Sequence, residues 1–142
     1  MPTGAGSWSH FSHEADIGLA GSGTTVEAVF EQMAAAMTGV ITDPALVRSV
    51  DGVTVHCEAP DIELLLVEWL NALIFEMATR DMLFGRFEVR IEGNRLDGEA
   101  WGEKISRERH QPAVEIKGAT YTSVKVAQLD DGRWLAQTVV DV

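Results

Sequence analysis

The amino-acid sequence predicts a single α+β domain, in which a mostly antiparallel or mixed β-sheet carries two main helices packed on it. Two observations support this fold class. Segments with alternating apolar and polar residues mostly follow one another across short turns, as in hairpins, and two longer segments repeat apolar residues at helical spacing. Grouped strands and helices favour an α+β fold over alternating βαβ units. A chain of 142 residues is long enough for one such domain with a sizeable core.

The first residues predict a tail followed by two short segments. Residues 1–6 are small, polar and glycine-rich, so we expect a flexible N-terminal tail and a folded domain over 7–142. The two segments that follow, at about 7–12 and 16–20, are short and contain apolar residues. The sequence Gly-Ser-Gly at 21–23 predicts a turn after them.

Thr24 opens a sequence that is typical of a helix N-terminus. Glu27 follows three residues later, which predicts a capping box in which the two side chains bond free amides of the first turn. Apolar residues then recur at helical spacing: Val26, Phe30, Met33 and Met37. Gly39 predicts the end of this helix. Asp43 before Pro44 predicts the end of the segment that follows, because a residue before proline resists helical torsions.

A strand and a second helix are predicted in the middle of the chain. Residues 53–59 alternate between apolar and polar side chains, as in a half-buried strand. Asp61 then predicts the N-cap of a helix over 62–78. This helix is apolar on most of its circumference, so we expect it to be the buried centre of the domain, laid on a sheet.

The C-terminal half predicts two hairpins. Alternating residues at 87–91 and a strand near 96–101 lie on either side of a Gly-Asn turn. The last hairpin is predicted to pair 121–129 with 134–140 across the Asp-Asp-Gly turn at 130–132.

The chain is strongly acidic, with 22 acidic residues, 11 basic residues and a net charge of −11. A protein that binds nucleic acid directly is expected to have a basic face, so this charge argues against direct nucleic-acid binding. The acidity favours cations or a basic protein partner as ligands. Solubility alone explains it equally well.

The sequence predicts neither a membrane protein nor a secreted one. The most apolar window, 62–78, carries four polar residues: Glu63, Glu68, Asn71 and Glu76. Such a window argues against a membrane span, and no apolar stretch follows a basic N-terminal region, as in a signal peptide. The single cysteine, Cys57, excludes an internal disulfide and is compatible with a reducing compartment. We therefore expect a cytoplasmic protein.

The last two residues suggest a metal site. The side chain of Asp141 and the α-carboxylate of Val142 place two anionic oxygen groups within one residue of each other. If the strand before them is anchored in a sheet, these oxygens can be held in fixed geometry, as Ca²⁺ or Mg²⁺ requires. A third acidic ligand would have to come from elsewhere, and Asp16 is the best candidate.

His13 lies close to Asp16 in sequence, but an extended chain would point the two side chains to opposite faces unless a bend lies between them. The alternative interpretation is that His13 bonds backbone groups while Glu14 and Asp16 are solvated. His10 and His13 together do not match a zinc pattern, because the HxxH spacing lacks a helical context.

Two other residues have both a structural and a functional interpretation. Asp43 precedes a proline and is expected to form a turn, although it could be a further oxygen donor. Lys117 is one of three lysines in the chain and flanks an apolar stretch, so it is either a surface residue or a functional one.

The sequence offers no convincing enzyme. His56 and Cys57 are neighbours on a predicted strand and therefore face opposite ways, so a Cys–His nucleophile pair is improbable. The chain has no nucleophile elbow, no P-loop and no dinucleotide fingerprint.

Six motifs occur in order along the chain: His13-Glu14-Ala15-Asp16-Ile17, Met37 to Asp43, Leu65 to Leu73, Gly102-Glu103, Glu115 to Tyr121, and Val140-Asp141-Val142. In these motifs and their spacing the chain resembles the archease family, from about Phe11 to Val142. The resemblance implies an archease-like single domain.

The resemblance also implies a function. Archeases are protein cofactors of the GTP-dependent RNA ligase that joins 2′,3′-cyclic phosphate or 3′-phosphate ends to 5′-hydroxyl ends, notably in tRNA splicing and RNA repair. A member is expected to promote guanylylation of the ligase's active-site histidine and to sustain multiple turnover, without catalysing ligation itself. The resemblance implies Asp16, Asp141 and Val142 as ligands of a divalent cation, in the first place Ca²⁺, with Mg²⁺ or Mn²⁺ as alternatives. Asp43 and Lys117 match further family positions of functional interest.

This chain departs from the family pattern at two places. Glu14 stands where the family usually has threonine, and Gly118-Ala119 replaces bulkier residues in the segment that presents Lys117. We expect these changes to affect metal affinity and contacts with the ligase. Two other functions remain open: a stand-alone metal-dependent hydrolase that uses Asp16, Asp43 and Asp141 with His13 as base, and a chaperone-like binding module.

Overall fold

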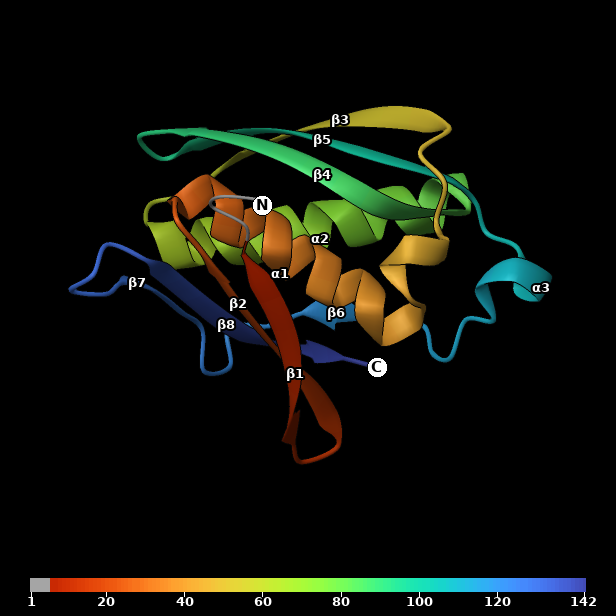
Figure 1. Cartoon of the computed structure of the whole chain (residues 1–142), viewed down its shortest axis with the longest axis horizontal. Coiled ribbons are helices and arrows are strands. Elements are labelled where there is room, and N and C mark those ends of the chain that lie inside the picture. The colour runs from red at the N-terminus through yellow and green to blue at the C-terminus, as the bar shows by residue number, and fades with distance from the viewer. Residues whose placement is uncertain (1–5) are drawn as a thin grey trace.

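Two long helices lie between two β-sheets in the structure, a computed structural model that describes residues 6–142 (Figure 1). Of the predicted tail at 1–6, all but Gly6 lies outside the described residues. The elements in chain order are β1 (Ser7–His13), β2 (Asp16–Gly23), α1 (Val26–Ile41), the short 3₁₀ helix η1 (Pro44–Leu46), β3 (Asp51–Glu58), α2 (Ile62–Arg80), β4 (Met82–Glu92), β5 (Arg95–Lys104), α3 (Arg107–His110), β6 (Gly118–Ala119), β7 (Lys125–Gln128) and β8 (Trp134–Asp141).

The predicted α+β class is confirmed, and the strands form two antiparallel sheets where the sequence suggested one. The larger sheet has the order β1-β2-β8-β6, with β7 also paired to β8, and the smaller sheet has the order β3-β5-β4. The reason for two sheets is the wide apolar surface of the helices. A helix that is apolar on most of its circumference has to be covered on more than one side.

The core lies between these layers and involves both helices equally. α1 packs on β2 and β8 of the larger sheet and on β4 of the smaller one, whereas α2 packs on β3 and on β6. The Trp69 side chain of α2 is fully buried, and its indole N–H donates to the carbonyl of Phe30 in α1 at 3.1 Å. α2 was expected to be the buried centre alone. It shares that place with α1, and its C-terminal half emerges at the surface, where Phe75 is 62% exposed.

Both ends of α1 differ from the sequence prediction. The N-cap is Thr25, whose hydroxyl accepts from the amide of Ala28 at 3.0 Å, so the prediction of a capping box starting at Thr24 is wrong by one residue. The helix also continues past Gly39 to Ile41. Gly39 makes room for Trp8 of β1, since a Cβ at this position would lie 2.5 Å from the indole ring.

The last hairpin is shorter than predicted on its first strand. The predicted strand 121–129 is a strand only over Lys125–Gln128, because residues 121–124 form a turn with Ser123 in the left-handed region and a hydrogen bond from the amide of Val124 to the carbonyl of Tyr121. This turn separates β6 from β7, and both strands pair with the same edge of β8. The predicted turn at 21–23 is also absent, because β2 extends through Gly23.

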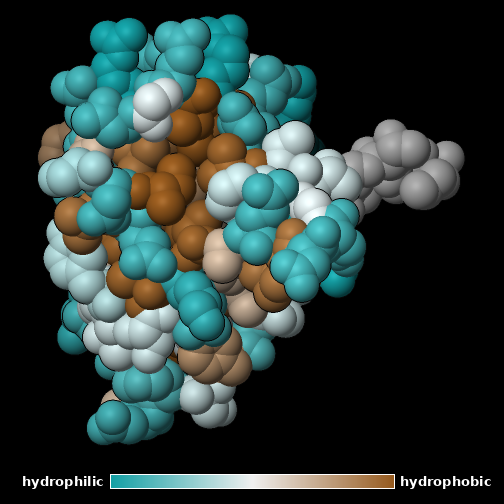
Figure 2. All heavy atoms as spheres, turned by 90° about the vertical axis from the view of Figure 1, so that its left-hand side faces the viewer, coloured by the Kyte–Doolittle hydropathy of each residue, from teal (hydrophilic) through white to brown (hydrophobic). Residues whose placement is uncertain are grey.

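The outer surface is mostly hydrophilic, and hydrophobic residues reach it at one end of the helical layer. Figure 2 views the end where α1 and α2 begin and shows hydrophobic residues gathered in its middle, with hydrophilic residues above them. Within residues 6–142 no helix combines the length and the apolar character needed to span a bilayer.

Candidate functional site

The turn between β1 and β2 brings His13 and Asp16 together. Glu14 and Ala15 form a two-residue turn, with Glu14 in the left-handed region at φ 54°, and His13 pairs with Asp16 as the first rung of the hairpin. Residues directly opposite each other in an antiparallel pair point to the same face of the sheet. The turn therefore supplies the bend that the sequence left open, and His13 and Asp16 share one face.

Asp141 lies on the same face, next to Asp16. Ile17 of β2 pairs with Val140 of β8, so Asp16 and Asp141 are the next residues along these two strands. The backbone of Asp141 is turned away from β2, because its carbonyl accepts from the amide of Lys117 at 2.8 Å. Asp16 and Asp141 thus occupy a position without hydrogen bonds between the two strands, where facing side chains approach most closely.

The strand that ends in Asp141 is firmly anchored. Val139 and Val140 are 1% and 0% exposed, and Gly118 of β6 pairs with Asp141 on the side opposite β2. β6 is itself held by Asn71 of α2, whose side-chain amide donates to the carbonyl of Ala119 at 3.2 Å and accepts from its N–H at 2.9 Å. This double contact fixes the strand despite its small residues, Gly118 and Ala119.

His13, Asp16 and Asp141 form a row at the end of the larger sheet, and the negative charge of this row is not balanced by an ion pair within residues 6–142. Asp16 is half-buried and Asp141 is exposed, and within residues 6–142 neither forms an ion pair. Two carboxylates that face each other across strands repel. The Nδ1 atom of His13 is buried and has no hydrogen-bond partner in the described part of the chain, so the interpretation of His13 as bonded to backbone groups is wrong for this nitrogen. The end of the sheet therefore collects negative charge and an unused imidazole nitrogen.

Lys117 adjoins the row, whereas Asp43 does not join it. The Lys117 side chain is exposed, and its backbone amide is the donor to Asp141 described above. Asp43 follows α1 and caps η1, where its carboxylate accepts from the amide of Ala45 at 3.0 Å. Asp43 thus has the turn-forming role that its position before proline predicts.

The oxygen groups of the row suit a hard cation. Within the described residues no three His, Cys, Asp or Glu side chains come close enough to form a metal site by themselves. A cation bound by Asp16 and Asp141 would therefore need another donor. Val142 follows directly on Asp141, and the Val142 side chain packs against the core. Such a set of oxygen donors is the kind that Ca²⁺ or Mg²⁺ takes.

The residues of this row line neither of two grooves on the described surface. One groove, of about 460 Å³, lies between the C-terminal ends of α1 and α2 and the segment 105–116. The other, of about 620 Å³, lies on the smaller sheet and is lined by polar residues such as His56, Glu88 and Asp97. Enzymes that act on small molecules usually enclose them in a cleft. An open charged end is better suited to contact with another macromolecule.

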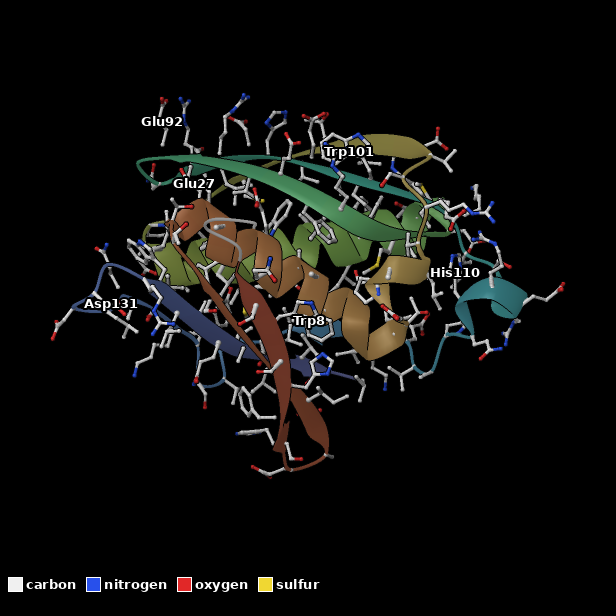
Figure 3. All side chains as sticks on the ribbon, viewed as in Figure 1. Trp8, Glu27, Glu92, Trp101, His110 and Asp131 are labelled. Atoms are coloured by element: carbon white, nitrogen blue, oxygen red, sulfur yellow. The ribbon has the colours of Figure 1, made fainter. Side chains whose placement is uncertain are left out.

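A second charged cluster, around Glu103, escaped the sequence analysis. Glu103 of β5 is buried, and its carboxylate receives hydrogen bonds from the Arg109 guanidinium at 2.6 Å, the Arg48 amide at 2.9 Å and the His110 Nε2 atom at 2.9 Å. The His110 Nδ1 atom accepts from the Ser106 amide, so the ring is protonated on Nε2 and donates from there to Glu103. Figure 3 shows His110 at the inner side of α3.

This cluster has a structural role. The Arg109 side chain, followed by the Arg48 amide, lowers the pKa of Glu103 to about 2. Every strong donor around this carboxylate is already used within the protein, and the bonds tie residues 48 and 106–110 to the end of β5. The local sequence signal for this cluster is weak: an acidic residue at the end of an alternating strand, with a histidine and two arginines soon after.

Comparisons with known proteins agree with this geometry. The family model described as "Archease protein family (MTH1598/TM1083)" matches residues 8–142. Protein archease of Pyrococcus furiosus is 38% identical over 139 residues, which cover 95% of this chain and 98% of that protein. Protein archease of Sulfolobus acidocaldarius is 34% identical over 134 residues, which cover 93% of this chain and 96% of that protein.

Two solved structures are similar to the fold. The solution structure of Methanobacterium thermoautotrophicum protein 1598 superposes with a TM-score of 0.81 at 32% identity, covering 97% of this chain and 99% of that one. A Thermotoga maritima archease, described as a possible chaperone, has a TM-score of 0.58 at 19% identity over 93% of this chain and 94% of that one, which shows likeness of fold alone. Because the family model and relatives above 30% identity span nearly the whole chain, this protein belongs to the archease family.

Proposed function

We propose that this protein is a non-catalytic activator of a GTP-dependent RNA ligase, which joins 3′-phosphate or 2′,3′-cyclic phosphate ends to 5′-hydroxyl ends. It would promote guanylylation of the ligase's active-site histidine and sustain multiple turnover in tRNA splicing or RNA repair. Family membership supports the proposal. The observation that carries it is the open row of His13, Asp16 and Asp141 at one end of the larger sheet, which is suited to contact with a macromolecule.

The charge of the protein is consistent with this role. An enzyme that binds RNA has a basic surface, and a partner with a net charge of −11 is attracted to such a surface over long distances. Electrostatic attraction of this kind speeds the encounter of two proteins and sets their orientation. The activator itself would not have to bind RNA.

In this proposal the row binds a divalent cation, in the first place Ca²⁺, with Mg²⁺ or Mn²⁺ as alternatives. Asp16, Asp141 and the α-carboxylate of Val142 would hold it. A bound cation would supply positive charge at the point where the two aspartates otherwise repel each other. Lys117, which is bonded through its backbone to Asp141, would add a cationic side chain at the edge of the same surface.

The direct test measures guanylylation of the cognate ligase with labelled GTP and Mn²⁺, with and without this protein. We expect the wild type to increase the labelled fraction of ligase and the number of turnovers. The variants Asp16→Asn and Asp141→Asn should lose this effect, while Asp130→Asn, at an exposed position in the turn between β7 and β8, serves as a matched control outside the row. If wild-type protein leaves both guanylylation and turnover unchanged, the proposed function is wrong.

The two alternative functions predict different results in parallel assays. A stand-alone hydrolase would release phosphate or cleave RNA with a divalent cation in the absence of any ligase. A chaperone-like module would suppress aggregation of unrelated heated proteins at stoichiometric amounts. For the activator we expect neither result.

Cation binding is tested separately by calorimetric titration with Ca²⁺ after removal of metals by EDTA. Asp16→Asn and Asp141→Asn should weaken binding strongly, and one residue added after Val142 should do the same because it moves the terminal carboxylate. Unchanged titrations in all three variants would refute the assignment of these ligands.

A further inference from the structure

The strand β1 forms an edge of the larger sheet, and the other strand edges are protected by the fold. An exposed edge offers unpaired N–H and C=O groups to other chains, so proteins usually cover it or place charges on it. In β4, the amide of Val89 donates to the Glu31 carboxylate of α1 at 2.9 Å. In β7, the amide of Val126 donates to the Glu63 carboxylate of α2 at 3.2 Å.

The two remaining edges are protected as well. On β6, Asn71 makes two hydrogen bonds to the backbone of Ala119, as described above. The strand β3 carries a charged residue at each of its two ends, Asp51 and Glu58, and charged side chains on an edge strand hinder regular pairing with a further strand. Helix side chains or charges therefore guard each of these edges.

β1 has neither kind of protection along its free edge. Its sequence, Ser-Trp-Ser-His-Phe-Ser-His, contains no Asp, Glu, Lys, Arg or Pro, and its first four residues are all exposed. The first acidic residues after this strand are Glu14 and Asp16, at the tip of the hairpin.

The same strand is held in a fixed position. All seven of its residues pair with β2, from Ser7 with Ser22 to His13 with Asp16. On the helix side, Trp8 (labelled in Figure 3) lies against Gly39 of α1. The Nε2 atom of His10 lies 2.8 Å from the carbonyl of Ala36. A rigid edge needs little ordering when another strand is added, which favours binding.

The hairpin geometry identifies the backbone groups that face outward. His13 and Asp16 close a two-residue turn, where the closing residues bond each other through their backbones. Because bonded and non-bonded pairs alternate along an antiparallel ladder, the N–H and C=O groups of Trp8, His10 and Ser12 point away from β2.

We propose that an extended segment of a partner protein binds along β1 and adds a strand to the larger sheet. The partner segment is expected to be basic, because the chain carries a net charge of −11 and acidic residues lie at the hairpin tip. The same charge disfavours a second copy of this chain as the occupant. The identity of the partner rests on the proposed function: it is the RNA ligase, and β1 leads directly to the row that contains His13 and Asp16. Strand addition of this kind obtains its affinity from main-chain hydrogen bonds.

The test compares Ser12→Pro with Ser12→Ala. Proline removes the outward N–H of residue 12 and obstructs an incoming strand, but it leaves the bonds to β2 intact because it is tolerated on the open side of an edge strand. We expect Ser12→Pro to raise the Kd for the ligase about tenfold, as the loss of one or two hydrogen bonds implies, and Ser12→Ala to leave it unchanged. Thermal unfolding verifies that both variants fold.

Hydrogen exchange of the complex gives a second measurement. The amides of Trp8, His10 and Ser12 should be protected in the presence of ligase, while the outward amides of β3 should not be. The proposal of strand addition at β1 is wrong under two conditions together: Ser12→Pro binds and activates the ligase as well as the wild type does, and the amides of Trp8, His10 and Ser12 stay unprotected in the complex. If wild type neither binds nor activates, the proposed function fails instead. Sedimentation of the protein alone should show a monomer, and β1-dependent self-association would replace the partner with a second copy.

Discussion

Carboxylates at the ends of the two sheets have opposite surroundings. At the end of β5, the single carboxylate of Glu103 is surrounded by Arg109, His110 and the amide of Arg48. At the end of the larger sheet, Asp16 and Asp141 face each other with no ion pair within residues 6–142. The negative charge of the first region is balanced by groups of the protein itself, and that of the second region is not balanced by an ion pair within residues 6–142.

This difference supports a structural role for the Glu103 cluster, and it is the reason for proposing a binding site at the row of Asp16 and Asp141. A buried charge that is fully bonded stabilises the segments around it, and removing it leaves its partners unsatisfied. Two like charges on adjacent strands cost stability unless a ligand offsets the repulsion. Substitutions should therefore destabilise the protein around Glu103, and should affect ligand binding more than folding around Asp16 and Asp141.

The largest effect on stability is expected for Glu103→Ala. The change leaves the N–H groups of Arg48 and His110 without their acceptor and releases Arg109, so the melting temperature should fall by several degrees. Arg109→Ala, which leaves two of the three partners in place, should lower it less. A melting temperature of Glu103→Ala equal to that of wild type would show that the cluster does not hold the fold.

The second effect is a dependence of stability on pH. The hydrogen bonds from Arg109 and Arg48 lower the pKa of Glu103 from 4.5 to about 2, so the folded protein favours the ionised carboxylate. The stabilisation is fully present above pH 4.5 and is lost as the pH falls toward 2. Urea unfolding at several pH values in this range should show a free energy of unfolding that changes less steeply with pH in Glu103→Gln than in the wild type. An equal pH dependence of the unfolding free energy in the two proteins would contradict the lowered pKa of Glu103.

A smaller effect is expected for Asn71→Ala. This change removes two hydrogen bonds to the backbone of Ala119 and should cost about 1–2 kcal/mol of unfolding free energy in a urea titration. Because β6 also positions Asp141, calcium affinity should fall too. Asn71→Asp retains the acceptor for the Ala119 amide but loses the donor to the Ala119 carbonyl, so it should also be less stable than the wild type. A change in stability without any change in calcium affinity would mean that β6 does not position the row.

The smallest effect on folding is expected for Asp16→Asn. In EDTA at low salt, removal of one of two facing charges should leave the unfolding free energy unchanged or raise it by about 0.5 kcal/mol. With Ca²⁺ the wild type should have the higher unfolding free energy of the two proteins, because only the wild type gains stability from a bound ion. Strong destabilisation of Asp16→Asn in EDTA would place Asp16 with Glu103 as a structural residue.

Local signals in the sequence predicted most of the elements. Asp61 is the N-cap of α2, as predicted, and its carboxylate accepts from the amide of Leu64 at 2.9 Å. The errors occurred where two residues offer the same local signal or where a distant residue decides. Thr24 and Thr25 are both good caps, and only the helix position selects Thr25. Gly39 resembles a helix stop, yet its role depends on Trp8, which lies on a different element.

The candidate site was predicted only in part for the same reason. Asp141 and Val142 are adjacent in the chain, so their pairing can be read directly from the sequence. That Asp16 lies beside Asp141 was implied by the family resemblance, and the register of β2 and β8 now gives the geometry. The network around Glu103 joins residues from separate segments, and the local pattern from Glu103 to His110 could not show that the amide of the distant Arg48 completes it.

The sequence by itself determined the α+β class, the order of hairpins and helices, and the acidity of the chain, because these depend on residues that are close neighbours or on composition alone. The tertiary structure decided that the strands form two sheets around the helices, that β1 is an open edge, and that Asp16 and Asp141 face each other without an ion pair within residues 6–142. These features depend on which distant residues the folded chain brings together, and strand register and packing fix those contacts.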